Sequence, residues 1–194
     1  MSTVKILAFA GSTRTGSFNK KLVSIAAAGA RAAGAEVTLI DLRDFPMPLF
    51  DGDVEEQSGL PDSAKKLKLL MIDHQGFLIA APEYNSSITA VFKNTIDWTS
   101  RPETDDEPPL VCFRGKTVAL MSTSPGALGG LRGLVTVKSI LGNIGCYLIP
   151  EQVAVPKAYE AFDDTGALKD AAQQKSITEL GRKLVEFTGK LAPR

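Results

Sequence analysis

The side chains best suited to chemistry lie in a short segment near the N-terminus, residues 11–17, which reads GSTRTGS. This segment follows an apolar run over residues 4–10 and precedes a helical pattern that starts at Asn19. Backbone N–H groups and hydroxyls of such a loop, a bidentate arginine and the unpaired donors of a helix N-terminus together bind phosphate. The residues that we expect to reach a phosphomonoester are Ser12, Arg14, Ser17 and Asn19. The alternative is an ordinary strand-to-helix connection with a surface arginine.

The glycine spacing separates this loop from the common nucleotide-binding motifs. Gly11 and Gly16 do not form the G-x-G-x-x-G pattern of dinucleotide sites. They match the two glycines of G-x-x-x-x-G-K-S/T, but Ser17 and Phe18 stand where that motif needs lysine and a hydroxyl residue. The loop also lacks the cysteine nucleophile of a low-molecular-weight phosphatase. A site for a terminal phosphomonoester therefore remains.

Two more polar segments follow apolar runs, residues 82–87 (PEYNSS) and residues 122–130 (STSPGALGG). Pro82 cannot donate to a sheet and would turn the chain outward. Tyr84 offers a flat face, and the peptide groups around it suit the edge of a heteroaromatic ring. The glycines of the second segment would let the backbone approach a ligand closely. The first segment could equally be a capped turn, and the second indicates no ligand by itself.

The elements that must position these loops form a doubly wound α/β fold with a parallel sheet, because five apolar runs alternate with helical patterns. Residues 4–10, 36–42, 76–81 and 116–121 are expected strands, and a short fifth strand within residues 146–155 is expected to break near Pro150. Expected helices cover residues 19–33, 63–74 with Ser63 as cap, 89–98, 131–141 and 168–190, and residues 45–62 read as a long loop. In such sheets ligands bind beyond the carboxyl ends of the strands, so the three loops should meet. We expect residues 1–194 to form a single domain.

The composition narrows the function classes. Lysine plus arginine equal aspartate plus glutamate at 22 each, which gives no sign of a nucleic-acid or anionic membrane partner. Cys112 and Cys146 lack the spacing of a zinc site, so we expect no metal and two buried thiols. No signal-type segment or membrane span is evident, which predicts a cytoplasmic protein. His74, the single histidine, is interpreted as a packed or surface residue.

The three loops together resemble the NADPH-dependent FMN reductase family, which includes flavodoxin-like quinone, chromate and azo-compound reductases. The matching segments occur in the correct order over most of the chain. They are GSxRxxSxN at residues 11–19, PEYNSS followed by FKNxxDW at residues 82–98, and SxSPG with a later Gly-Gly pair at residues 122–130. The resemblance implies a flavodoxin-like five-stranded sheet of order 2-1-3-4-5 with helices on both faces. It also implies bound FMN, NADPH or NADH as co-substrate, and a homodimer that often pairs into a homotetramer.

Carried over by position, the resemblance assigns the cofactor-binding residues. The FMN phosphate would be held by Ser12, Arg14, Ser17 and Asn19, with Phe18 beside them. The isoalloxazine ring would be lined by Pro82, Glu83, Tyr84 and Asn85, and its other edge would lie near Ser122, Ser124 and Gly126. Arg101 matches an arginine that in some relatives lies near the nicotinamide cofactor or the tetramer contact. His74-Gln75 departs from the Ala-Asp of relatives, but outside the ligand loops.

The implied reaction moves hydride from NAD(P)H to FMN and then reduces a quinone or another small acceptor, such as chromate, an azo compound or free flavin. The flavin performs the chemistry, so no catalytic side chain is expected. The peptide groups of residues 83–85 and 122–126 are expected to stabilise charge on the reduced ring. The apolar Val91, Phe92, Ile96 and Trp98, together with the helix after Gly130, present more apolar area than one sheet face can cover, which favours a second subunit.

Two alternatives to this enzyme remain. A non-enzymatic flavin-binding or electron-carrier protein is disfavoured, because carriers of the flavodoxin kind usually dock through a strongly acidic surface and this chain is neutral. An NAD(P)-binding domain of the Rossmann kind is disfavoured by the missing G-x-G-x-x-G loop, although Asp41 is a partial candidate for its acid.

Overall fold

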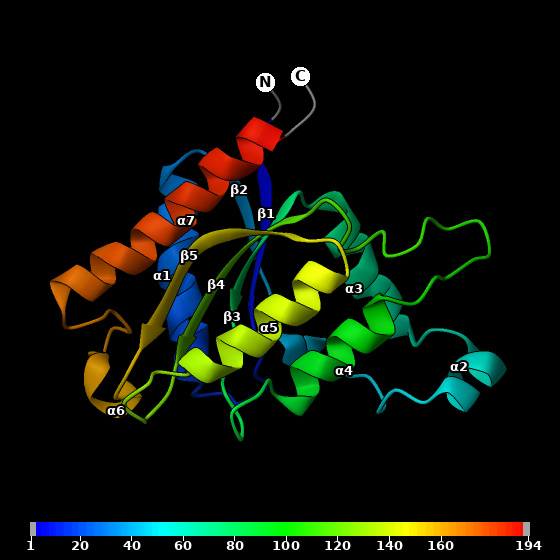
Figure 1. Cartoon of the computed structure of the whole chain (residues 1–194), viewed down its shortest axis with the longest axis horizontal. Coiled ribbons are helices and arrows are strands. Elements are labelled where there is room, and N and C mark those ends of the chain that lie inside the picture. Colours follow the sequence, from blue (N-terminus) through cyan, green and yellow to red (C-terminus); the bar gives the residue numbers. More distant parts are fainter. Residues whose placement is uncertain (1–2, 192–194) are drawn as a thin grey trace.

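The computed structural model describes residues 3–191 of the chain. Its five parallel strands form one sheet in the order β2-β1-β3-β4-β5 (Figure 1). The strands are β1 (Lys5–Ala10), β2 (Glu36–Leu39), β3 (Gly76–Ala80), β4 (Thr117–Thr123) and β5 (Tyr147–Val155). The predicted flavodoxin-like order is therefore confirmed. Strand order reverses between β1 and β3, and a crevice for a ligand opens at such a point.

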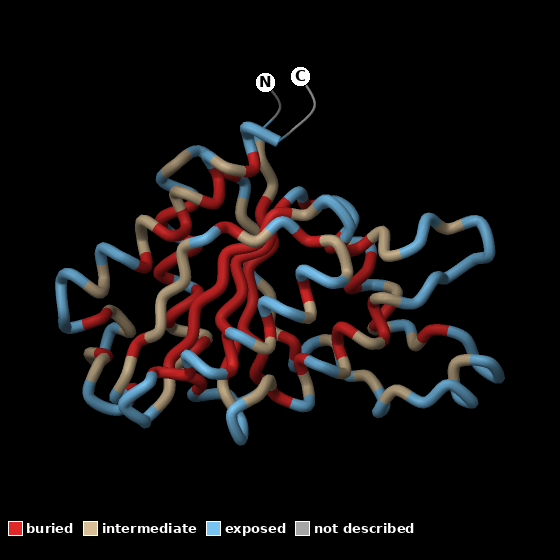
Figure 2. The backbone as a smooth tube through the Cα atoms, in the orientation of Figure 1, coloured by how far each residue is buried: buried red, intermediate tan, exposed pale blue. Residues whose placement is uncertain are grey.

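Helices cover both faces of this sheet. They are α1 (Phe18–Ala32), α3 (Asp62–Asp73), α4 (Ala90–Thr99), α5 (Leu131–Asn143) and α7 (Ala171–Leu191). Helices α1 and α7 pack on one face against Ile6 and Ala8, whereas α3, α4 and α5 pack on the other against Leu7 and Phe9. The faces alternate along β1 because side chains in a strand have a period of two. The central strands are buried throughout, as their continuous apolar runs predict (Figure 2).

Two glycines let α1 and α7 touch backbone to backbone. A Cβ on Gly29 of α1 would lie 2.1 Å from the carbonyl oxygen of Thr178. A Cβ on Gly181 of α7 would lie 2.0 Å from the carbonyl oxygen of Ala26. Any larger residue would force the two helices apart, so this crossing fixes how α7 covers the sheet and α1.

Several element boundaries differ from the sequence prediction. The segment predicted as a loop contains α2 (Gly52–Ser58), whose start is capped by Asp51 through a 2.9 Å hydrogen bond from the N–H of Asp53. Helix α3 starts at Asp62 after Pro61, so the prediction that Ser63 caps it is wrong. β2 ends at Leu39, earlier than predicted, and is followed by the short 3₁₀ helix η1 (Leu42–Asp44).

The C-terminal part differs in a similar way. β5 continues through Pro150 for nine residues, with a register shift opposite β4, rather than breaking there. It is an edge strand, where a proline without an N–H is tolerated. A further short helix, α6 (Ala158–Ala161), follows β5, and the last helix begins at Ala171 instead of residue 168.

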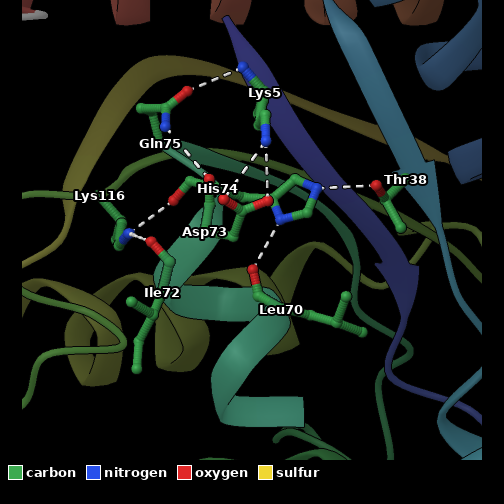
Figure 3. Close-up of polar contacts among 8 residues, drawn as sticks. All are labelled: Lys5, Thr38, Leu70, Ile72, Asp73, His74, Gln75 and Lys116. Carbon is green, nitrogen blue, oxygen red and sulfur yellow. Dashed lines mark hydrogen bonds and ion pairs between the residues drawn. The ribbon is translucent and has the colours of Figure 1, made fainter. Parts of the chain in front are cut away.

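The single histidine is packed at the sheet edge opposite the three predicted ligand loops. His74 is 3% exposed and ends α3. Its Nδ1 donates to the carbonyl oxygen of Leu70 at 2.6 Å, so in the neutral ring Nε2 accepts from the Thr38 hydroxyl at 2.8 Å (Figure 3). Lys116 Nζ donates to the carbonyl oxygens of Ile72 and His74 at 2.8 and 2.6 Å. Side chains thus satisfy the last carbonyls of α3, and His74 is confirmed as a packed residue.

Both thiols are buried, as predicted. Burial raises the pKa of the Cys112 thiol to about 11 and that of the Cys146 thiol to about 12. Each sulfur lies near a carbonyl oxygen, that of Lys68 for Cys112 and that of Phe113 for Cys146. They behave as small apolar core residues.

Candidate functional site

The three predicted loops meet beyond the carboxyl ends of β1, β3 and β4 and enclose one open cavity of about 230 Å³ (lower edge of the sheet in Figure 1). The predicted residues that line it are Ser12, Arg14, Ser17, Phe18, Asn19, Pro82, Glu83, Tyr84 and Ser124. The predicted residues that do not line it are Asn85, Ser122, Gly126 and Arg101. Thr123 and Pro125, which also line it, belong to the predicted loop over residues 122–130 but were not assigned one by one, and Tyr159 lies outside all three predicted loops.

Residues 11–17, the phosphate loop, supply the donors at one end of the cavity. Ser12 is 7% exposed, and its Oγ accepts from the N–H of Arg14 at 3.3 Å while its own hydrogen stays available. Ser17 precedes α1 as its N-cap, but within the described chain its hydroxyl makes no capping hydrogen bond. The first N–H groups of α1, those of Phe18 and Asn19, have no intrahelical acceptor. Two hydroxyls, a guanidinium and a helix N-terminus suit a phosphate dianion.

The start of the phosphate loop is tied to two elements. Gly11 donates its N–H to the carbonyl oxygen of Ala80 in β3 at 2.9 Å and accepts from the Thr89 hydroxyl at 2.7 Å. The same Thr89 oxygen accepts from the N–H of Phe92 at 3.2 Å, so it also caps α4. A Cβ at position 11 would lie 3.0 Å from Cβ of Phe92. Glycine is needed here because the loop runs directly against α4.

Asn19 joins the phosphate end of the cavity to the ring end. Its Nδ2 donates to the carbonyl oxygen of Thr123 at 2.9 Å, and its Oδ1 accepts from the N–H of Thr123 at 3.1 Å. The side chain is 5% exposed. Most of its hydrogen-bonding capacity therefore positions α1 against the end of β4, which leaves its backbone N–H and one amide hydrogen for a ligand.

A tight turn supplies the ring end. The N–H of Tyr84 donates to Ser87 O, and the N–H of Ser87 donates to Tyr84 O, both at 3.0 Å. The central residues Asn85 and Ser86 have φ of 52° and 65°, the left-handed pair that a type I′ turn requires. Asparagine tolerates this conformation better than most residues. The turn leaves Tyr84 60% exposed at the rim, where its ring is accessible to a ligand.

Glu83 turns its carboxylate away from the turn, toward the start of α5. The carboxylate accepts from the N–H of Gly133 at 3.0 Å and from Nε and Nη2 of Arg132 at 2.9 and 2.7 Å. Burial raises the pKa of Glu83, but the Gly133 hydrogen bond and the Arg132 ion pair outweigh it and hold this pKa below its ordinary value. The carboxylate thus stays ionised at neutral pH and binds the positive end of the α5 dipole.

The third loop contributes Thr123, Ser124 and Pro125 rather than all of its predicted residues. Ser122 lies within β4 and is fully buried, and its hydroxyl has no hydrogen-bond partner among residues 3–191. A Cβ on Gly130, which has φ of 90°, would lie 2.0 Å from that hydroxyl. The oxygen of Gly126 accepts from the N–H groups of Gly129 and Lys157, both at 3.3 Å. Ser122 and Gly126 therefore support the backbone of this loop and do not line the cavity.

An aromatic wall borders the phosphate end. The Phe18 ring meets that of Tyr159 edge to face at 5.4 Å and stacks on Phe162 at 5.6 Å. The Arg14 guanidinium lies 5.6 Å from the centre of the Phe18 ring. Tyr159 follows β5, whose carboxyl end reaches the same edge of the sheet as the three loops. The signal that the sequence offered was an aromatic residue shortly after the fifth strand.

Arg101 lies away from this cavity. Its Nε donates to the Glu55 carboxylate at 2.7 Å, and its guanidinium lies 5.9 Å from the centre of the Phe50 ring. Its carbonyl oxygen accepts from Lys68 Nζ, which also pairs with Glu107 at 2.5 Å in the interior. Within the described residues, no group of three His, Cys, Asp or Glu side chains is placed to hold a metal.

The donor set fits FMN. Hydroxyls, a guanidinium and helix N–H groups gather at one end for the phosphate, and an exposed tyrosine lies at the other for the ring. The single carboxylate of the lining is already neutralised by Arg132, so it does not repel the phosphate or a reduced ring.

Known proteins are similar to this chain over most of its length. The family model described as NADPH-dependent FMN reductase matches residues 4–160. An NAD(P)H-dependent FMN reductase of Pseudomonas aeruginosa is 32% identical over 177 residues, which cover 91% of this chain and 90% of that protein. A quinone reductase of Escherichia coli K12 is 33% identical over 138 residues, or 71% of this chain and 69% of that protein.

A solved structure extends the likeness over the whole fold. FerB, a flavoenzyme NAD(P)H:(acceptor) oxidoreductase from Paracoccus denitrificans, superposes with a TM-score of 0.80 at 25% identity, covering 97% of this chain and 98% of that one. The agreement of family model, relatives, fold and cavity leads to one conclusion. The chain belongs to the NADPH-dependent FMN reductase family of oxidoreductases.

Proposed function

We propose that this protein binds FMN in the cavity and uses it to transfer electrons from NADPH or NADH to quinones. The observation that carries the proposal is the single cavity that combines a phosphate loop with an open ring end. When bound, FMN supplies the redox chemistry by accepting hydride and passing electrons to an acceptor. The quinone reductase of E. coli supports quinones as the acceptor class.

The proposed roles of the protein groups follow from their positions. Ser12, Arg14, Ser17 and the first N–H groups of α1 hold the phosphate, and Phe18 with Tyr159 screens it from solvent on one side. Tyr84, Ser124 and Pro125 border the ring and orient it. Asn19 and Glu83 position these groups, since their side chains bind Thr123 and α5.

The open rim suggests a broad choice of acceptors. Tyr84 and Tyr159 are 60% and 72% exposed, so nothing in the described chain covers this side of the cavity closely. Chromate, azo compounds and free flavin are therefore proposed acceptors beside quinones. Arg101 remains a proposed contact to the nicotinamide cofactor or to another subunit, with its ion pair to Glu55 holding it at the surface.

A homodimer is proposed from only one of the two helices that the sequence indicated. Phe92, Ile96 and Trp98 are at most 4% exposed in the single chain, so the argument that they need a partner is wrong. The exposed apolar residues beside the cavity are instead on or next to α5: Leu128, Leu131 and Val135, at 50%, 48% and 67% exposure. A second copy packed there would also border the flavin site, and two dimers would give the proposed homotetramer.

This surface can be tested by sedimentation. Val135→Glu should shift the protein toward monomer, because the new charge would have to be buried in the contact. Leu69→Glu is the matched control, since Leu69 is equally exposed, at 67%, on α3. A monomeric native protein, or equal effects of both variants, would contradict the proposed surface.

We also propose that the protein works in the cytoplasm without nucleic-acid or membrane partners, in line with its zero net charge. Within residues 3–191, no helix combines the length and the apolar character needed to cross a membrane.

The activity is tested with the purified protein. It should show the absorption bands of bound flavin, which NADPH or NADH should bleach in the absence of oxygen and a quinone should restore. A protein that binds flavin but is not reduced by either nicotinamide would be a carrier rather than an enzyme. A protein that does not bind added FMN at all would refute the site.

A further inference from the structure

Two residues that follow β2, Asp41 and Arg43, contact the phosphate loop and the start of α1 from outside the cavity. We propose that both are positioning residues, which keep the backbone of this loop in the conformation that binds the FMN phosphate. This inference rests on the proposed assignment of the loop to that phosphate. Neither residue lines the cavity, so each would act through the loop and not by touching the cofactor.

Arg43 fixes the middle of the loop. Its Nε donates to the carbonyl oxygen of Thr13 at 2.8 Å, and its Nη2 donates to the same oxygen. A planar guanidinium that gives two N–H groups fixes an acceptor more rigidly than a single donor does. Across the trans peptide that follows Thr13, the N–H of Arg14 points the opposite way. That N–H donates to Ser12 Oγ at 3.3 Å, in the lining of the cavity.

Asp41 connects Arg43 to α1, which starts directly after the loop. Its Oδ1 accepts from the N–H of Arg43 at 3.0 Å, and its Oδ2 pairs with Lys20 Nζ in the first turn of α1 at 2.5 Å. Burial raises the pKa of Asp41, but the hydrogen bonds from Lys20 and Arg43 leave it below its ordinary value. The ionised carboxylate therefore links the residue that holds Thr13 to the helix at the other end of the loop.

Several carbonyl oxygens of this loop are engaged by protein donors. Gly11 O accepts from Thr89, Thr13 O from Arg43, and Arg14 O from the N–H of Ser17 at 3.3 Å. A free carbonyl oxygen turned toward the cavity would repel a phosphate, whereas converging N–H groups attract it.

A ribose-binding role for Asp41, of the kind found in dinucleotide-binding domains, does not fit this geometry. Its two carboxylate oxygens are turned to groups of the same chain, one accepting from the N–H of Arg43 and the other from Lys20 Nζ, and it does not line the cavity. The acid at the end of β2 therefore serves the phosphate loop of the same chain.

The test compares two flavins that differ only in the phosphate. Flavin-free protein is titrated with FMN and with riboflavin, and binding is followed by flavin fluorescence. Arg43→Ala should raise the Kd for FMN by about 3- to 10-fold, the effect of a lost hydrogen bond to a charged group at a partly solvated site. The Kd for riboflavin should stay within about twofold, because riboflavin has no phosphate for the loop to hold. Arg43→Lys keeps the positive charge but loses the paired guanidinium donors. Its Kd for FMN should therefore be close to that of Arg43→Ala.

Arg31→Ala is the matched control, because Arg31 is also exposed and donates to a backbone oxygen, that of Val37 at 2.9 Å, at the far end of α1. It should change neither Kd. Equal weakening of FMN and riboflavin by Arg43→Ala, or full recovery of FMN binding in Arg43→Lys, would overturn the positioning role. Arg14→Ala separates the two proposals. If it weakens FMN at least tenfold while Arg43→Ala does not, only the positioning role fails; if neither weakens FMN, the phosphate assignment fails with it.

Discussion

The pair of hydrogen bonds between Asn19 and Thr123 makes a strong prediction, because it connects α1 to the end of β4 in the middle of the site. Asn19→Ala removes the acceptor of the Thr123 N–H and the donor to the Thr123 carbonyl oxygen at the same time. The N–H and the carbonyl of Thr123 would be left in a residue that is 3% exposed. The change should therefore affect both the stability of the fold and the binding of FMN.

The magnitude follows from the two groups. An unpaired buried donor or acceptor costs about 1–3 kcal/mol. Asn19 lines the cavity, so water can enter the gap and satisfy part of this loss. We expect the free energy of unfolding to fall by about 2–3 kcal/mol, or the melting temperature by about 4–12 °C for a chain of this length. The Kd for FMN should rise about 3- to 10-fold, because the two ends of the site lose their fixed spacing.

Asn94→Ala is the matched control for this experiment. Its side chain also pairs with one segment twice, accepting from the N–H of Phe50 at 2.8 Å and donating to Pro48 O at 2.9 Å, but outside the cavity. Urea unfolding should show a loss of stability in both variants, and FMN titration should show weaker binding in Asn19→Ala alone. A loss below about 0.5 kcal/mol in Asn19→Ala, or equal loss of FMN affinity in both, would refute the reasoning.

Three further predictions concern the fold and its charges. The pKa of Glu83 is lower in the folded protein than its unfolded-state value of 4.5. The stability that this shift contributes is present above pH 4.5 and is lost as the pH falls through the folded-state pKa. In urea titrations, the difference in unfolding free energy between the native protein and Glu83→Gln should therefore shrink on acidification. Gly29→Ala should destabilise the protein by about 3 kcal/mol or more, because its Cβ would lie 2.1 Å from a carbonyl oxygen of α7, whereas Gly52→Ala, with open space around it, should be nearly neutral in thermal melts. Cys112 and Cys146, with pKa values of about 11 and 12, should resist a thiol reagent at pH 8 until urea unfolds the chain; fast labelling of the native protein would contradict their burial.

The sequence predicted the sheet well because its central strands are buried on both faces. β1 and β3 read as continuous apolar runs, and each is followed at once by a polar loop. Helix α2 escaped prediction since it has no buried residues and hence no apolar periodicity. β5 was expected to break near Pro150, although an edge strand loses little when one N–H is missing.

The site was predicted where local motifs mark it and missed where distant segments complete it. Tyr159 has no motif, and it reaches the cavity only because β5 ends at the same edge. Trp98 was assigned to a subunit contact because its cover comes from afar in the sequence. Pro48 O accepts from its Nε1 at 2.8 Å, and the Phe50 ring packs against it at 5.0 Å. The apolar periodicity of one helix cannot show that a segment about 50 residues earlier in the sequence packs against it.

The backbone contact between α1 and α7 bears on how the chain folds during synthesis. α7 is the last helix in the described chain. Because α1 packs against it at Gly29 and Gly181, α1 lacks this packing partner until α7 has been synthesised. The apolar face of β1 that α1 and α7 share stays partly open until residues 171–191 have left the ribosome. Because α1 also follows the proposed phosphate loop directly, a nascent chain would hold this end of the cavity rigidly only after residues 171–191 have emerged.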